Sequence, residues 1–76
     1  MKTIKVLGPG CANCKQTHTL IAEVARGKGI EIQLEKIEDI KAIMSYGILS
    51  TPGVVVDGKV VHAGGIPPRA KVEGWL

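Results

Sequence analysis

The sequence predicts a single α/β domain with a four-stranded mixed sheet flanked by three helices, in the order β-α-β-α-β-β-α. The apolar run at 3–7 is followed by a stripe of apolar residues at helical spacing, and residues 30–35 alternate between apolar and polar. An Asp-Gly pair at 57–58 separates two valine-rich runs. With 76 residues, of which 45% are hydrophobic, the chain has the length and composition of one globular domain spanning residues 1–76.

The first half of the chain is expected to form a strand, a helix and a second strand. Residues 3–7 form a strand that ends at the Gly-Pro-Gly turn of 8–10. A helix over 12–26 follows, because its apolar residues recur at helical spacing and glycines stand at its end. Residues 30–35 alternate with a period of two, which predicts a half-exposed edge strand. We expect these two strands to be parallel, because a right-handed helical crossover joins them.

The second half is expected to form a short helix, a hairpin and a final helix. Acidic residues at the start of 38–46 favour the N-terminal end of a helix there. Residues 54–56 and 60–61 flank the Asp-Gly pair, which favours the tight turn of an antiparallel hairpin. A Pro-Pro pair then precedes a last helix that ends at Leu76, because proline is tolerated in a first helical turn.

Two cysteines lie three residues apart in the turn that joins the first strand to the first helix. The segment reads Gly8-Pro-Gly-Cys11-Ala-Asn-Cys14-Lys. Unpaired backbone N–H groups and the helix dipole stabilise a thiolate at a helix N-terminus. A disulfide that closes so short a loop adds at most about 2 kcal/mol to stability. The pattern therefore predicts reactive thiols at Cys11 and Cys14 rather than a structural cross-link.

Together with two further segments, this motif resembles the small thioredoxin-fold redox-active disulfide proteins of archaea and bacteria, some of which are called glutaredoxin-like. The other segments are Tyr-Gly-Ile-Leu-Ser-Thr-Pro at 46–52 and the hairpin at 54–61. The resemblance covers essentially the whole chain and implies a thioredoxin-like three-layer sandwich. It also implies a cis bond between Thr51 and Pro52, with Pro52 packed against the cysteines and the Thr51 backbone binding substrate.

The resemblance implies a thiol–disulfide oxidoreductase that reduces protein or small-molecule disulfides with no bound cofactor or metal. Cys11, at the helix start, would attack the substrate, and Cys14, one turn deeper, would resolve the mixed disulfide. An upstream reductase, whose type the residues do not name, would supply the electrons. Thioredoxins carry a buried acid where this chain has Lys5, which we expect to be a surface lysine.

Two other functions share parts of this pattern. Soft-metal (copper) carriers also place a Cys-x-x-Cys pair before a first helix, and thiolates suit Cu(I). Those domains usually have Met where this chain has Pro9, and they give no role to the Thr-Pro pair at 51–52. Glutathione-dependent glutaredoxins have a glycine pair like that at 64–65. In glutaredoxins this glycine pair is followed by acidic residues that bind glutathione, whereas in this chain it is followed by Ile-Pro-Pro at 66–68.

The two histidines are candidates for further metal ligands. His18 follows Cys14 by four residues, on the same helix face, and His62 would be the fourth ligand of a closed site. A histidine on a hairpin strand is more often a surface or core residue, so we assign no metal role to either.

The charges exclude some partners. The net charge is +3, but the ten Lys and Arg residues are scattered and interleaved with acids, and the chain has one Trp and one Tyr. A nucleic-acid partner is not expected, because neither a basic stripe nor stacking aromatics are present. Without a leader-like or membrane-length apolar run, we expect a cytoplasmic monomer that does not bind a membrane.

Overall fold

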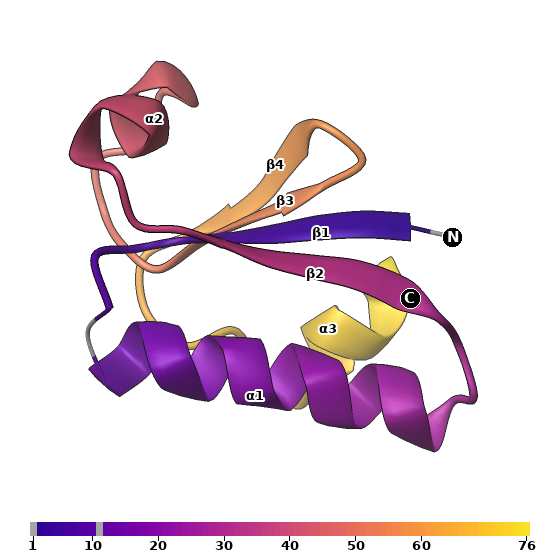
Figure 1. Cartoon of the computed structure of the whole chain (residues 1–76). Coiled ribbons are helices and arrows are strands. Elements are labelled where there is room, and N and C mark those ends of the chain that lie inside the picture. The colour runs from indigo at the N-terminus through magenta and orange to yellow at the C-terminus, as the bar shows by residue number, and fades with distance from the viewer. Residues whose placement is uncertain (1, 11) are drawn as a thin grey trace.

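The computed structural model describes residues 2–10 and 12–76, and its strands and helices follow the predicted order (Figure 1). The elements are β1 (Lys2–Leu7), α1 (Ala12–Gly27), β2 (Ile32–Ile37), α2 (Ile40–Ser45), β3 (Gly53–Val56), β4 (Lys59–Ala63) and α3 (Arg69–Trp75).

The elements differ from the predicted ranges by one or two residues at several ends, and capping explains the later starts of the second strand and the second helix. The second strand begins at Ile32 rather than at residue 30, because residues 28–30 form the turn that caps the C-terminal end of α1. Gly29 has a φ of 67°, its amide bonds the Arg26 carbonyl, and the Ile30 amide reaches back to the Ala25 carbonyl. The second helix covers 40–45 rather than 38–46, because Asp39 lies outside it as the N-cap.

The sheet is mixed, as predicted. Its strand order is β2-β1-β3-β4, with β1 and β2 parallel and the other two pairs antiparallel. The first strand is central, with Leu7 opposite Ile37 of β2 and Gly53 of β3. The carboxyl ends of β1 and β2 therefore reach the same edge of the sheet. The α/β fold class is confirmed, and β2 is an edge strand as expected.

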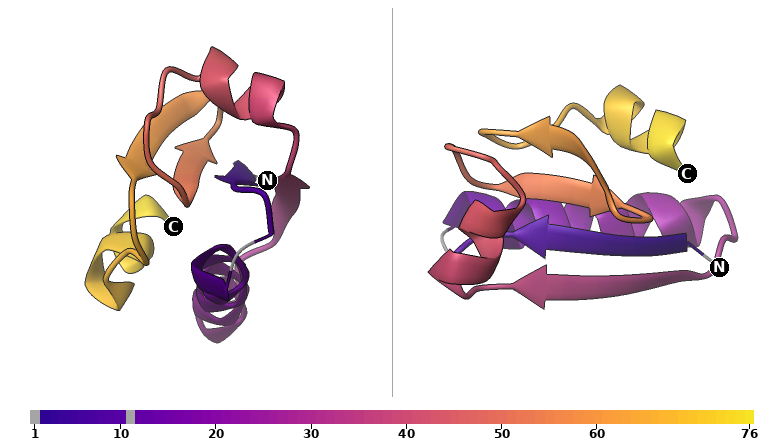
Figure 2. Two further views of the ribbon diagram at one scale, coloured as in Figure 1. Left: turned by 90° about the vertical axis from the view of Figure 1, so that its left-hand side faces the viewer. Right: turned by 90° about the horizontal axis from the view of Figure 1, so that it is seen from above.

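The helices cover the sheet on both faces and make three layers, with α1 and α3 on one face and α2 on the other (Figure 2). Side chains alternate along β1, so Ile4 and Val6 pack toward α1 and α3 while Leu7 packs toward α2. Two clusters of buried residues result: Ile4, Val6, Ile21, Val24, Val54 and Val72 on the first face, and Leu7, Ile43, Ile48 and Val55 on the second.

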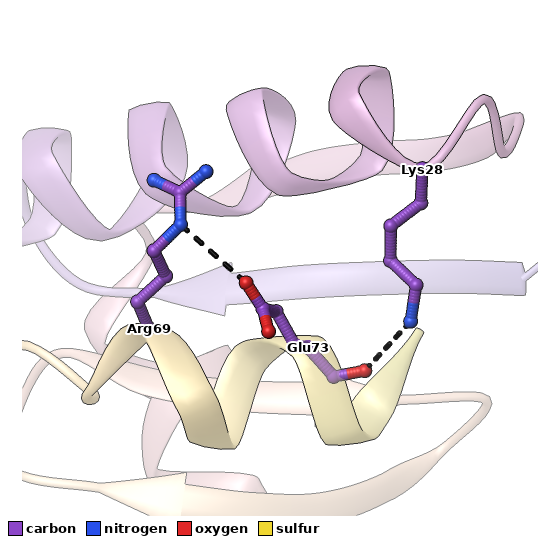
Figure 3. Close-up of polar contacts among 3 residues, drawn as sticks. All are labelled: Lys28, Arg69 and Glu73. Atoms are coloured by element: carbon purple, nitrogen blue, oxygen red, sulfur yellow. Dashed lines mark hydrogen bonds and ion pairs between the residues drawn. The ribbon is translucent and has the colours of Figure 1, made fainter.

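One hydrogen bond joins α3 to the residue that follows α1, and one ion pair lies within α3 (Figure 3). The Lys28 ammonium group donates a hydrogen bond to the Glu73 carbonyl oxygen at 3.0 Å, near the end of α3. An amine near a helix C-terminus satisfies a carbonyl that has no partner within the helix. The Arg69–Glu73 ion pair at 3.5 Å is exposed, and such pairs contribute only about 0.3–0.5 kcal/mol. The packing of α3 therefore rests mainly on Val72, which is fully buried.

The hairpin between β3 and β4 has the turn that the sequence predicts. Asp57 and Gly58 have φ values of 50° and 85°, as a type I′ turn requires. The Asp57 carboxylate also accepts a hydrogen bond from the Thr3 amide at 3.0 Å, which ties the turn to β1. After β4, the Gly64 amide donates to the Pro52 carbonyl at 2.9 Å. In the described part of the chain, no helix has the length and apolar character needed to cross a bilayer.

Candidate functional site

Cys14 lies in the first turn of α1 and is 5% exposed. It is disulfide-bonded in the structure. The prediction for Cys11 falls on a residue outside those that the structure describes. The part of the site that is described therefore contains the inner cysteine, on the helix that packs under the sheet.

Gly8 makes the closest approach to this cysteine. A Cβ atom added to Gly8 would lie 2.1 Å from the Cys14 Sγ and 3.1 Å from its Cβ. No real Cβ atom comes that close, so residue 8 must lack a side chain for the sulfur to lie there. The sequence assigned Gly8 only to a turn, because a glycine needed for space looks the same in a sequence as a turn glycine.

Thr51 reaches the same point from the other side of the turn. Its Cβ lies 3.8 Å from the Cβ position of Gly8, so Cys14 and Thr51 flank one glycine. The peptide bond between Thr51 and Pro52 is cis, the isomer that the resemblance implies. Pro52 is fully buried, whereas Thr51 is exposed. The structure thus brings together Cys14 and the Thr-Pro segment that the sequence singled out.

A small cavity opens beside Cys14. Its volume is about 30 Å³, and its lining residues are Val6, Gly8, Gly10, Cys14, Lys15, Lys36 and Glu38. A cavity needs only about 10–15 Å³ to hold a water molecule, so this one has room for water. Three of its lining residues are charged: Lys15 of α1, Lys36 of β2 and Glu38 of the segment after β2. Sequence reasoning missed Lys36 and Glu38, which lie more than 20 residues from the cysteines.

The β1 residue that faces this cavity is Val6, not Lys5. Because neighbouring residues of a strand point to opposite faces, Lys5 lies on the face that α2 covers. There its ammonium group contacts the Tyr46 hydroxyl oxygen at 3.5 Å, and Lys5 is half-buried. The expectation of a surface lysine is therefore only partly met, and Lys5 takes no part in the site.

His18 lies one helical turn after Cys14 on α1. Burial, and then the positive charge of Lys36, lower the pKa of His18 below its usual 6.5. Lys36 thus acts on His18 and also lines the cavity.

His62 lies elsewhere in the fold. Its Nε2 is 3.0 Å from the Gly65 carbonyl oxygen, and its ring centroid is 6.1 Å from that of Trp75. These contacts agree with a structural role between β4 and α3. Across residues 2–10 and 12–76, no three His, Cys, Asp or Glu side chains form a group that could hold a metal ion.

Two large apolar side chains are exposed in the segments next to Thr51. Leu49 is fully exposed, and Ile66 is 40% exposed, whereas Ile48 is buried in the core on the α2 side. The Gly64–Pro52 hydrogen bond links the segment of Ile66 to that of Thr51. The exposed apolar surface therefore borders the Thr-Pro segment.

Comparison with known proteins agrees with this geometry. The family model described as "Thioredoxin domain" matches residues 2–76. A thioredoxin of Methanothermobacter thermautotrophicus is 30% identical over 76 residues, which cover 100% of this chain and 99% of that protein. Two thioredoxins of Methanocaldococcus jannaschii are 33% identical over 76 residues and 31% identical over 68 residues. These alignments cover 100% and 86% of this chain, and 87% and 80% of those proteins. None of these matches favours the soft-metal carrier.

Proposed function

We propose that the chain, which belongs to the thioredoxin family and therefore has a redox function of the thioredoxin type, is a thiol–disulfide oxidoreductase. It would cycle a Cys11–Cys14 dithiol and disulfide to reduce disulfides in proteins or small molecules. The observation that carries the proposal is the position of Cys14, which is buried against Gly8 at the point that Thr51 also reaches. Such a place suits a thiol that reacts within the protein rather than with free substrate.

The exchange takes two steps. The Cys11 thiolate attacks one sulfur of a substrate disulfide, the substrate S–S bond breaks, and the first product thiol leaves. The Cys14 thiolate then attacks the Cys11 sulfur, forms the internal disulfide and releases the second product thiol. Two electrons and two protons leave the protein in each cycle. Since Cys14 is 5% exposed, it is suited to the second step.

The substrate would lie across the Thr-Pro segment. Thr51 is exposed and offers its backbone to an extended substrate, while the buried Pro52 fixes the course of the chain behind it. Leu49 and Ile66 would give a protein substrate apolar surface to bury. We further propose that the protein acts in the cytoplasm as a monomer and receives its electrons from a separate reductase.

The test is reduction of insulin disulfides by dithiothreitol, with and without the protein. The wild type should accelerate the reaction, and both Cys11→Ser and Cys14→Ser should abolish this. The two variants control for each other, because Cys14→Ser alone should accumulate a covalent adduct with substrate, visible by mass spectrometry. A wild-type protein that leaves insulin oxidised and retains copper or zinc through gel filtration would contradict the proposal.

A further inference from the structure

We propose that Glu38 accepts the proton of Cys14, through water in the cavity that both residues line, when Cys14 resolves the mixed disulfide. This inference rests on the function proposed above. It assigns a proton acceptor to a step in which a buried thiol must become a thiolate.

The step requires an acceptor near Cys14. A thiol attacks a disulfide only after it has lost its proton, and Cys14 is 5% exposed, so bulk water has little direct access to it. The cavity beside it has room for water, which can carry a proton between groups that do not touch.

The lining of the cavity leaves one candidate. Val6, Gly8 and Gly10 contribute no ionisable side chain, and the Lys15 and Lys36 ammonium groups have no lone pair with which to accept a proton. Among the described residues that line the cavity with Cys14, Glu38 alone has a carboxylate, whose oxygens can accept a proton. Glu38 is also exposed to solvent, so it can pass the proton on to bulk water.

The sheet places Glu38 at this position. The parallel strands β1 and β2 end side by side, and the Gly8 amide donates to the Ile37 carbonyl at 2.9 Å. The chain after β2 therefore runs beside the turn at residues 8–10, which precedes the helix of Cys14. There the Glu38 Oε2 lies 2.9 Å from the Cβ position of Gly10, so the carboxylate sits against the Gly10 backbone.

The charges around the cavity assist the transfer. The Lys15 and Lys36 ammonium groups attract the thiolate that remains on Cys14. His18 faces Lys36 on the same side of the sheet, but it does not line the cavity. From β1 only the apolar Val6 faces the cavity, because Lys5 lies on the opposite face.

In this step the Cys14 S–H bond breaks, its proton moves to a water, and that water gives a proton to Glu38. The Cys14 electron pair forms the S–S bond with the Cys11 sulfur. The bond between Cys11 and the substrate breaks, and the substrate sulfur leaves with its electron pair. Glu38 then releases the proton to solvent, and the substrate sulfur takes up a proton from solvent. The protein dithiol is thereby oxidised to the disulfide, and its two electrons reduce the substrate disulfide to two thiols.

The test follows the reaction of the reduced protein with dithiobis(nitrobenzoate) by stopped flow. In the first phase Cys11 attacks the reagent and releases one coloured thiolate, at a rate that rises with reagent concentration. In the second phase Cys14 resolves the mixed disulfide and releases a second coloured thiolate, at a rate that does not depend on reagent concentration. Glu38→Gln should slow this second phase about tenfold at pH 7, which is less than the roughly 10²–10⁴-fold of direct general-base effects because the base acts through water. The difference should shrink as the pH approaches the range where a thiol ionises unaided, and added imidazole should restore part of the rate.

Glu31→Gln is the matched control, because it removes the same charge just before the other end of β2. It should leave the second phase unchanged, and equal melting temperatures of both variants and wild type would show that the fold is intact. Removal of a nearby negative charge without a proton relay favours the thiolate and speeds resolution.

An unchanged or faster second phase in Glu38→Gln therefore overturns the proposal, as does slowing confined to His18→Gln. If the wild type shows no second phase, the proposed function itself fails and this inference fails with it.

Discussion

The contact between Gly8 and Cys14 makes Gly8→Ala the most informative single substitution. The new methyl carbon would lie 2.1 Å from the Cys14 Sγ. Heavy atoms in contact lie about 3.5–4.0 Å apart, so the overlap is roughly 1.5 Å. The sulfur belongs to a buried side chain in the first turn of α1, so either that turn or the end of β1 must move. Overpacking of a core costs about 1–3 kcal/mol, and we expect about 3 kcal/mol here.

Urea unfolding followed by circular dichroism measures this loss in the oxidised and the reduced protein. For a domain of this size, 3 kcal/mol corresponds to a fall in melting temperature of about 12–24 °C. Gly74→Ala is the control, because the space around Gly74 in α3 is open and alanine favours a helix by up to about 1 kcal/mol. If Gly8→Ala and the wild type unfold at the same urea concentration, the proposed close packing of the sulfur against residue 8 is wrong.

Three further pairs of substitutions test contacts at Gly53, His18 and Asp57. Gly53→Ala places a Cβ 2.6 Å from the Ile48 Cδ1, the flexible end of a side chain, so urea unfolding should show a loss of about 1–2 kcal/mol that Ile48→Val partly reverses. Lys36→Gln removes the second cause that lowers the pKa of His18, so this pKa should rise toward 6.5 in an NMR titration. Because the pKa of His18 is lower in the folded than in the unfolded protein, the free energy of unfolding should fall as the pH drops through about 6.5, and His18→Gln should lessen this fall. Asp57→Ala removes the hydrogen bond from β1 and puts alanine at a φ of 50°, so melting should show a loss of about 1–2 kcal/mol, whereas Asp57→Asn should lose less.

Features set by neighbours in the chain could be predicted from the sequence. The turn at Asp57 and Gly58 follows from two adjacent residues that tolerate a positive φ, and the structure has both. The element order likewise follows from periodicity and turn residues. The start of the second strand was wrong by two residues, because Ile30 continues the apolar alternation yet its amide closes the end of α1.

Features set by packing between distant elements could not be predicted in the same way. The space that Gly8 leaves for a sulfur depends on how closely α1 approaches β1, which no local pattern records. Glu38 was assigned to the first turn of a helix, since acids favour that position. It lies instead on the segment before α2 and lines the cavity of Cys14. The face on which Lys5 lies depends on the pleat of β1, and the tertiary fold decides it.

The hydrogen bond from the Gly64 amide to the Pro52 carbonyl makes one backbone proton a reporter on this part of the molecule. If the connection between β4 and α3 moves away from Thr51, this hydrogen bond breaks. In heavy water the Gly64 amide proton can then exchange for deuterium. Its exchange rate therefore measures how often this surface opens. A bound polypeptide that clamps both segments would slow the exchange, so docking could be followed without any label on sulfur.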